Sequence, residues 1–326
     1  MRRREFLALA GFASAFPGAT WGQTANRVRR IGVLLAATPD DLQYQNRLKA
    51  FSQTLAQLGW TEGQNLQIDT RWGGGHSELT RQYAEELAKL APDIILASGN
   101  ATVTPLLQAT RTIPVVFAVV ADPVGSGYAE TLSRPGGNAT GFMQFEYGLS
   151  GKWLELLHQI APQVKRVAVF RDLIGGIAQF AVIQSVAPSV GIEVNPFDMR
   201  EAAEIEHAVT TFARSENGGL IITASAFANV HRELIISLAA RHKLPAIYFA
   251  RYFVDDGGLM SYGTDLVEQF RQAAAYADRI LKDEKPANMP VQAPTKYDLV
   301  INLKSAKALG LAVPPALIAR AHAVIE

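Results

Sequence analysis

The residues of this chain that could bind or react lie mostly in short polar turns that follow apolar runs. The clearest case lies between Ile95 and Pro105, where an apolar run stops at Ser98-Gly99-Asn100 and a helical pattern starts at once. A glycine frees the backbone at such a turn, and a Ser or Asn side chain can cap the first helical amides. Bare amides at a helix start also attract an anion. The stretch is therefore either a capped strand-to-helix turn or the rim of a ligand site.

Sequence patterns typical of catalysis or cofactor binding are absent. The chain has no P-loop, no G-x-S-x-G elbow, no H-E-x-x-H pair among its six histidines and no cysteine. The missing cysteines exclude disulfides, thiolate zinc sites and cysteine nucleophiles. Gly73-Gly74-Gly75 lacks the spacing of a dinucleotide-binding loop, so we interpret it as a flexible turn. We expect a binding protein without catalytic residues, metal or cofactor.

The elements that must position these turns follow a regular rhythm. Apolar runs alternate with helical patterns about every 30 residues, the length of a βαβ unit. The runs are continuous, which is typical of a parallel sheet covered on both faces. The rhythm breaks in the Gly- and Pro-rich stretch 133–142, interpreted as the approach to a crossing between domains, and restarts at Ser150. The chain is therefore predicted to form two similar α/β halves.

The predicted elements can be given by residue number. We expect strands at 29–36, 65–72, 93–99, 114–122, 166–172, 193–199, 218–226, 245–251 and 257–263. We expect helices at 41–60, 78–91, 101–111, 150–160, 176–190, 202–215, 229–241 and 265–282, then an extended segment at 288–303 and two short helices. In the first helix, the apolar residues at helical spacing are Leu42, Leu48, Phe51, Leu55 and Leu58.

The first 22 residues have the layout of an export signal. Arginines at positions 2–4 precede an apolar segment from Phe6 to Phe16, followed by Pro17 and small residues. This order is typical of a signal peptide, and the apolar segment is shorter than the roughly 20 residues that span a bilayer. The run 3–7, RREFL, resembles the twin-arginine pattern. We expect a signal peptide at 1–22 and a soluble, periplasmic mature protein, with an uncleaved amphipathic tail as the alternative.

Length and composition limit the domains and partners. The chain has 326 residues, of which 48% are hydrophobic and 19% charged, and two domains is the usual expectation for this length. The formal net charge is +1, from 31 basic and 30 acidic residues. A nucleic-acid footprint is normally a strongly basic face. We therefore expect no nucleic-acid partner, and we expect a monomer.

Three long blocks resemble a known family. They are 121–142 (ADPVGSGYAETLSRPGGNATGF), 257–282 and 285–311. In these blocks the chain resembles solute-binding proteins of ABC transporters, in the group that includes tryptophan- and tyrosine-type binding proteins. The resemblance implies a type I periplasmic binding fold, in which two Rossmann-like lobes with parallel sheets are joined by three crossover strands. It places lobe 1 at 29–142 plus 264–288 and lobe 2 at 143–263 plus 289–326, and it implies an ABC permease as the membrane partner.

The expected ligand site follows from the strand ends. In open α/β sheets, ligands lie beyond the carboxyl ends of the strands, and in a two-lobed protein those ends face one another across a cleft. The candidate ligand-binding residues are Thr38, Ser98, Gly99, Asn100, Ala101, Thr102 and Asp122 from the first lobe, Arg171, Asp172, Ser225, Phe227 and Asn229 from the second, and Arg251, Phe253 and Tyr262 near the second crossing.

Several of these residues have two possible roles. No acidic residue follows Gly99 before Arg111, so we expect Ser98–Thr102 to hold the anionic end of the ligand, with a plain capped turn as the alternative. Arg171 either pairs with a ligand carboxylate or with Asp172 or a surface residue.

One acidic and three aromatic candidates also have two possible roles each. Asp122 either accepts an ammonium group or caps its own turn. Phe227, Phe253 and Tyr262 either form aromatic walls for the ligand or belong to the core.

The function expected from these observations is binding for transport. We expect the extracytoplasmic component of an ABC uptake transporter, which closes on a small amino acid or organic acid. By resemblance, aromatic and branched amino acids come first. A periplasmic sensor subunit for a signalling partner is the alternative, and an exported α/β hydrolase is disfavoured because no nucleophile or metal set is present.

Overall fold

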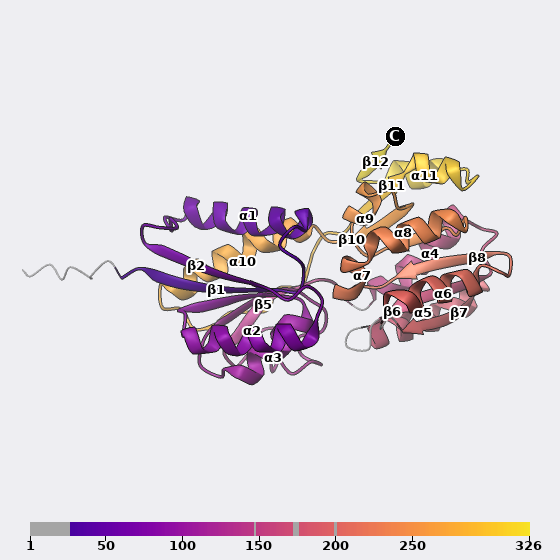
Figure 1. The fold of residues 1–326 in the computed structure, drawn as a ribbon. Coiled ribbons are helices and arrows are strands. Elements are labelled where there is room, and N and C mark those ends of the chain that lie inside the picture. The colour runs from indigo at the N-terminus through magenta and orange to yellow at the C-terminus, as the bar shows by residue number, and fades with distance from the viewer. Residues whose placement is uncertain (1–26, 147, 172–175, 199–200) are drawn as a thin grey trace, which may run out of the picture.

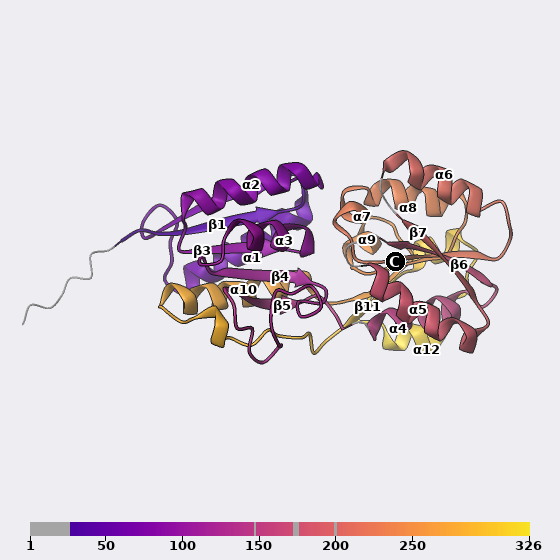
Figure 2. The ribbon, with the colours of Figure 1, turned by 90° about the horizontal axis from the view of Figure 1, so that it is seen from below.

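The computed structural model describes residues 27–326 except 147, 172–175 and 199–200, so the predicted signal peptide at 1–22 lies outside the described residues. The described chain forms two α/β lobes that lie side by side, each with helices on both faces of a sheet (Figures 1 and 2). Among the described helices, none is long and apolar enough to cross a membrane.

The first lobe contains a five-stranded parallel sheet in the order β2-β1-β3-β4-β5. Its strands are β1 (Arg29–Leu35), β2 (Leu66–Trp72), β3 (Ile94–Ser98), β4 (Val115–Val120) and β5 (Ala139–Met143). Helices α1 (Leu42–Gln57) and α10 (Leu266–Leu281) cover one face, and α2 (Ser77–Leu90) and α3 (Asn100–Ala109) cover the other (Figure 1).

The inner strand β1 shows why this sheet must be covered on both faces. Every residue from Ile31 to Leu35 except Gly32 is a fully buried aliphatic residue. Successive side chains of a strand point to opposite faces, so Ile31, Val33 and Leu35 pack into the core under α1 and α10, whereas Leu34 packs into the core under α2 and α3. The continuous apolar run is thus the sequence signature of a two-faced parallel sheet.

The second lobe contains a seven-stranded sheet in the order β12-β11-β10-β9-β8-β6-β7. Its strands are β6 (Arg166–Arg171), β7 (Glu193–Asp198), β8 (Gly218–Ile222), β9 (Ala246–Tyr248), β10 (Met260–Gly263), β11 (Asp298–Asn302) and β12 (Ala323–Ile325). Its helices are α4 (Leu149–Ile160), α5 (Gly176–Val190), α6 (Ala202–Phe212), α7 (Ala226–Val230), α8 (Arg232–Arg241), α9 (Tyr252–Asp255), α11 (Leu303–Ala308) and α12 (Pro315–Arg320). The strands pair in parallel except for β10 with β11.

The stretch 133–142, expected to lead into a crossing, contains most of the fifth strand of the first sheet, and the connection after this strand does cross to the second lobe. Gly141 makes the pairing of β5 with β4 possible, because its φ is +152° and an added Cβ would lie 1.9 Å from the carbonyl oxygen of Phe117. The predicted helix 229–241 is divided at His231 into α7 and α8, and the end of the chain adds the short strand β12.

Three connections join the lobes, and Gln269 at the start of α10 holds two of them together. Its amide oxygen accepts a hydrogen bond from the Val119 amide (2.9 Å), and its amide nitrogen donates to the Met143 carbonyl (2.9 Å) and to the Thr264 hydroxyl (3.3 Å). The Thr264 hydroxyl donates in turn to the carbonyl of Gln144 (3.0 Å). The connections after β5 and after β10 therefore share one buried side chain.

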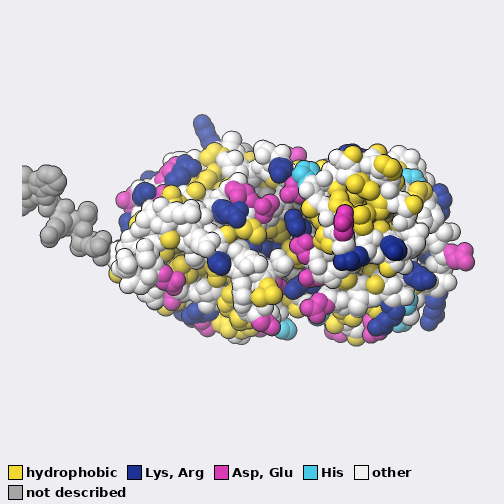
Figure 3. All heavy atoms as spheres, turned by 90° about the horizontal axis from the view of Figure 1, so that it is seen from above, with side chains coloured by type: hydrophobic (Ala, Val, Ile, Leu, Met, Phe, Trp, Pro, Cys, Tyr) yellow, Lys and Arg dark blue, Asp and Glu magenta, His cyan; other side chains and the backbone are white. Residues whose placement is uncertain are grey.

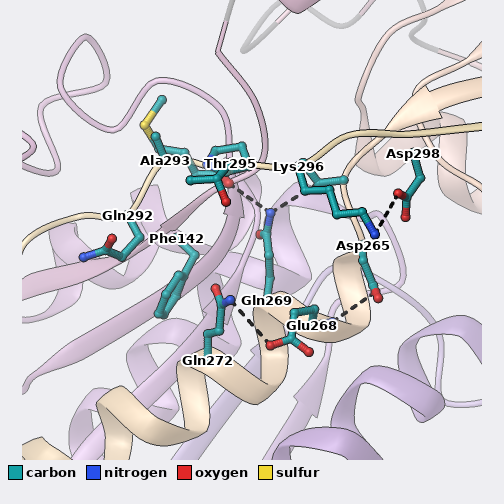
Figure 4. A pocket seen from close by; sticks show the side chains of 13 residues that line it. Phe142, Asp265, Glu268, Gln269, Gln272, Gln292, Ala293, Thr295, Lys296 and Asp298 are labelled. Atoms are coloured by element: carbon teal, nitrogen blue, oxygen red, sulfur yellow. Dashed lines mark hydrogen bonds and ion pairs between the residues drawn. The ribbon is translucent and has the colours of Figure 1, made fainter.

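The third connection is held against β5 by backbone hydrogen bonds. The amide of Gln292 donates to the Gly141 carbonyl (2.9 Å), and the amide of Met143 donates to the Gln292 carbonyl (2.8 Å). A pocket of about 200 Å³ lies between this connection and the first turns of α10, and Gln269 lines it with its amide bonded to Met143 and Thr264 (Figure 4). The lobes are thus linked at one hinge made of three closely bonded segments.

Replacing Gln269 with Leu should destabilise the protein, because it leaves the Val119 amide and the Met143 carbonyl without their partner. Each buried group left unsatisfied costs about 1–3 kcal/mol, so the free energy of unfolding should fall by about 2–4 kcal/mol in urea titrations. The control Gln272→Leu alters an exposed side chain one turn further along α10 and should change little. Equal effects of the two substitutions would show that Gln269 does not hold the hinge.

Candidate ligand-binding cleft

The lobes touch one another through segments that follow the carboxyl ends of their strands. Asp41, after β1, forms an ion pair with Arg232 of the second lobe (Nη1–Oδ2 3.1 Å). Gly75, after β2, lies against Val230, whose side chain would be 3.1 Å from an added Cβ. Since ligands of parallel α/β sheets lie beyond these strand ends, the cleft between the lobes is the candidate site.

The turn Ser98–Thr102 is largely held by its own side chains. Gly99 has a positive φ of 81°, and its carbonyl accepts hydrogen bonds from both the amide (3.1 Å) and the hydroxyl (3.0 Å) of Thr102. The Asn100 side chain accepts from the Ala121 amide (3.0 Å) and donates to the Ser126 hydroxyl (3.0 Å). The side chains of Asn100 and Thr102 therefore stabilise the turn, as the alternative of a capped turn requires.

Ser98 differs from its neighbours in this turn. Its side chain is 2% exposed, and within the described residues its hydroxyl has no hydrogen-bond partner. A buried hydroxyl without a partner is costly, so Ser98 is the one side chain of the turn that has no internal partner among the described residues to explain it. That this turn holds an anionic end stays a prediction.

The other first-lobe candidates lie at strand ends and have local partners. Thr38 is exposed after β1, and its hydrogen bond to Asp40 lowers the pKa of that carboxyl group. Asp122 accepts a hydrogen bond from the Gly125 amide (2.8 Å) and so caps its own turn. Ala101 is half-buried in the first turn of α3.

The second-lobe candidates Arg171 and Ser225 also have internal partners. Arg171 pairs with Asp198 on the neighbouring strand (Nε–Oδ1 2.8 Å), and its guanidinium lies 4.9 Å from the centre of the Phe180 ring. Asp172, the partner expected from the sequence, lies outside the described residues. The Ser225 hydroxyl caps α7 by accepting from the Ala228 amide (3.2 Å).

The remaining second-lobe candidates divide between the cleft and the core. Asn229 is buried and accepts a hydrogen bond from the Tyr252 hydroxyl, while Phe227 is half-buried with its ring 4.3 Å from that of His231. Burial lowers the pKa of His231. Phe253 is fully buried in the core of the second lobe with its ring 4.9 Å from that of Tyr248, so packing alone explains its position.

Arg251 and Tyr262 lie toward the hinge. Arg251 is exposed and pairs with Asp255 within α9 (3.3 Å). The Tyr262 ring lies 5.8 Å from that of Tyr297, and the Tyr262 carbonyl accepts a hydrogen bond from the Trp153 indole (2.7 Å). Tyr262 therefore joins the second and third connections and lies beside the hinge.

A second contact between the lobes was not predicted from the sequence. Arg47 of α1 lies between Tyr44 of its own helix, 4.3 Å from the ring centre, and Tyr252 of the second lobe, 5.1 Å from the ring centre. Arg47 is 1% exposed, and burial raises the pKa of Tyr252. The sequence signal for this cluster is a charged residue on the buried face of a helix, because charged side chains are almost never fully buried without a partner.

The described residues contain no group of three or more His, Asp or Glu side chains arranged to hold a metal ion.

Two hinged α/β lobes with a cleft at the strand ends define a type I periplasmic binding fold. The family model of the ABC transporter substrate binding proteins matches residues 35–325, and the chain belongs to this family. The sequence-based fold class and the prediction that the chain is a binding protein and not an enzyme are thus confirmed.

Individual relatives agree with this assignment. The tyrosine-binding protein of Clostridioides difficile strain R20291 is 23% identical over 265 residues, which is 81% of this chain and 76% of the relative. A conserved domain protein of Vibrio cholerae O1 biovar El Tor strain N16961 is 27% identical, with a TM-score of 0.83 over 91% of this chain and 100% of that one. An ABC domain of Streptococcus pneumoniae in complex with L-Trp is 24% identical, with a TM-score of 0.83 over 91% of this chain and 99% of that one.

The ion pair between Asp41 and Arg232 should favour contact between the lobes. Because the chain has no cysteine, Lys49→Cys and Ser237→Cys place one spin label on each lobe, at exposed positions. In this background Arg232→Met should lengthen the measured label distance in the ligand-free protein. The control Arg241→Met removes an exposed pair with Glu206 inside the second lobe and should leave the distance unchanged. An unchanged distance in Arg232→Met would exclude a role for the pair in lobe contact.

Proposed function

We propose that this protein is the extracytoplasmic solute-binding component of an ABC uptake transporter and that it closes its lobes on a small carboxylate-bearing ligand. The observation that carries the proposal is the match of the family model to residues 35–325, together with a cleft whose two sides belong to different lobes. The mechanism is closure without chemistry: the lobes rotate about the hinge at Gln269 and enclose the ligand.

An aromatic amino acid is the ligand that we favour. One relative is named a tyrosine-binding protein, and a structural neighbour was solved with L-Trp. In this chain the rings of Tyr44 and Tyr252 approach one another across the cleft with Arg47 between them. Aromatic rings of this kind suit an aromatic ligand, and the hydroxyl of Ser98 adds a hydrogen-bond donor on the first lobe.

The proposed location and partner follow from the N-terminal sequence and the family. The arginines and apolar segment at the start of the chain have the order of a signal peptide, which supports export to the periplasm. There the closed monomer would present both lobes to an ABC permease in the membrane. Each lobe supplies half of that surface, so the permease can distinguish the closed form from the open one.

A thermal-shift screen of the mature chain tests the ligand class. A ligand that binds only the folded protein at 100 times its Kd adds about 2.7 kcal/mol of stability. L-tryptophan or L-tyrosine should therefore raise Tm by several degrees, whereas sugars should not. A response confined to sugars, or no response to any amino acid or organic acid, would refute the proposal.

Ser98→Ala tests the donor on the first lobe. The substitution removes a hydroxyl that bonds no described residue, so Tm without ligand should stay the same. Loss of one hydrogen bond of about 1 kcal/mol should weaken binding of the responding amino acid about fivefold in calorimetric titration. Thr102→Val is the matched control, because it removes a hydroxyl bonded to Gly99 and should lower Tm. Unaltered affinity in Ser98→Ala would remove this turn from the site.

A further inference from the structure

Arg47 is a buried cation whose two Nη atoms form no hydrogen bond of normal geometry within the described residues, although the Tyr252 hydroxyl lies beside its guanidinium. Its side chain is 1% exposed, and neither Nη1 nor Nη2 has a hydrogen-bond partner there. The rings of Tyr44 and Tyr252 offer their faces to the guanidinium, but a cation–π contact satisfies none of its N–H groups. Burying a charge without a hydrogen-bonded partner costs several kcal/mol, so an anion beside Arg47 would stabilise the contact between the lobes.

The nearest carboxylates are already engaged elsewhere. Asp41 caps α1 by accepting from the amides of Gln43 (2.9 Å) and Tyr44 (3.3 Å), and its second oxygen pairs with Arg232. On the hinge side, Asp255 pairs with Arg251. Asp265 caps α10 through the amides of Val267 (2.8 Å) and Glu268 (3.0 Å). None of these acids is among the partners of Arg47, although all three lie close to the contact between the lobes.

Arg47 also borders a pocket to which both lobes contribute. The pocket has a volume of about 140 Å³ and lies between α1, α9 and the start of α10, with Gln43 and Arg47 on one side and Tyr252 on the other. Basic and acidic side chains gather along the seam between the lobes in the space-filling view (Figure 3). Arg47 therefore lines a pocket between the lobes, with its two Nη atoms buried behind that lining.

We propose that Arg47 binds the carboxylate of the amino-acid ligand and that this bond couples ligand binding to closure of the lobes. The proposal rests on the proposed function, and it places the acid group at Arg47 instead of at the turn Ser98–Thr102, where the sequence-based expectation put it. A guanidinium can hold a carboxylate through two parallel hydrogen bonds, which suits the two free Nη atoms. Asp255, Asp265 and Asp298 line the same pocket together with Arg251, so the acids outnumber the cations by one and suit the ammonium group of the same ligand.

The coupling follows from what closure does to Arg47. Contact with Tyr252 of the second lobe removes the guanidinium from water, so closure without an anion carries the cost of an uncompensated charge. A ligand shifts a conformational equilibrium only through its different affinity for the two states. A carboxylate on Arg47 supplies that difference, because it offsets a cost that exists in the closed state and is absent from the open one.

The decisive experiment compares acids with their amides. Calorimetric titrations measure Kd for L-tryptophan, L-tyrosine and their carboxamides with the wild type, Arg47→Met and Arg47→Lys. The wild type should bind the acid about a hundredfold more tightly than the amide, as expected for a buried charge pair. Arg47→Met should lose this preference, with the acid weakened about a hundredfold and the amide unchanged or tighter. Arg47→Lys keeps the charge without the bidentate geometry and should weaken the acid about tenfold.

Two results of these titrations would contradict the proposal. If Arg47→Met folds with a normal Tm and keeps the wild-type ratio of acid to amide affinity, the carboxylate lies elsewhere and the proposal is wrong. Loss of that ratio in Ser98→Ala instead would return the acid group to the turn Ser98–Thr102.

A second experiment uses no ligand and tests the role of Arg47 independently of the proposed function. In the spin-labelled Lys49→Cys, Ser237→Cys background, Arg47→Met should shorten the label distance without ligand, since closure no longer buries an unpaired charge. Arg47→Lys should keep the wild-type distance. A distance in Arg47→Met equal to or longer than the wild-type value would overturn the coupling. Failure of the wild type to bind any of the four probes would refute the aromatic ligand class and leave this arm to decide the role of Arg47.

Discussion

The contact between the two lobes is constrained by one guanidinium that is buried between them. Arg47 lies on the first lobe, Tyr252 closes over it from the second, and the neighbouring pair of Asp41 with Arg232 crosses the same seam. Low surrounding polarity makes such a charge costly when alone and strongly attractive to an anion. Under our proposal the cleft selects a charged ligand, and the state of the lobes depends on whether that ligand is bound.

The hinge makes this dependence possible. Gln269 ties the connection after β5 to the connection after β10, and the backbone of Gln292 adds the third. Three segments bonded at one place restrict sliding of one lobe against the other, so the closure that we propose is a rotation that brings the same surfaces together. A small ligand at the seam can therefore control the arrangement of two large, rigid bodies.

Most of the fold could be predicted from the sequence because the signals were long and redundant. The buried runs around Ile31–Leu35 and Leu220–Ile222 can only be strands covered on both faces, and the helices between them have ordinary lengths. The features that the sequence did not predict depend on tertiary contacts. The composition of 133–142 predicts the approach to a crossing but not the strand β5 that forms there, which Gly141 lets pair closely with β4. Strand β12 is three residues long and exists because β11 lies beside it.

The site was harder to predict because polarity near a strand end does not distinguish a cap from a ligand contact. Asn100, Asp122 and Ser225 all satisfy local amides, whereas the cluster at the seam comes from a helix interior. Helical spacing of leucines pointed to Leu42 and Leu58, but these are 66% and 39% exposed, and the buried face instead contains Tyr44 and Arg47. An arginine on a buried face becomes meaningful only when its lack of a partner is seen in three dimensions.

The most direct test is a crystal structure of the mature protein grown with L-tryptophan or L-tyrosine. The account predicts closed lobes with the ligand carboxylate within hydrogen-bonding distance of both Nη atoms of Arg47 and with Tyr252 packed over them. Lobes that stay apart around a bound ligand, or a ligand whose carboxylate meets no basic side chain from α1, would contradict it.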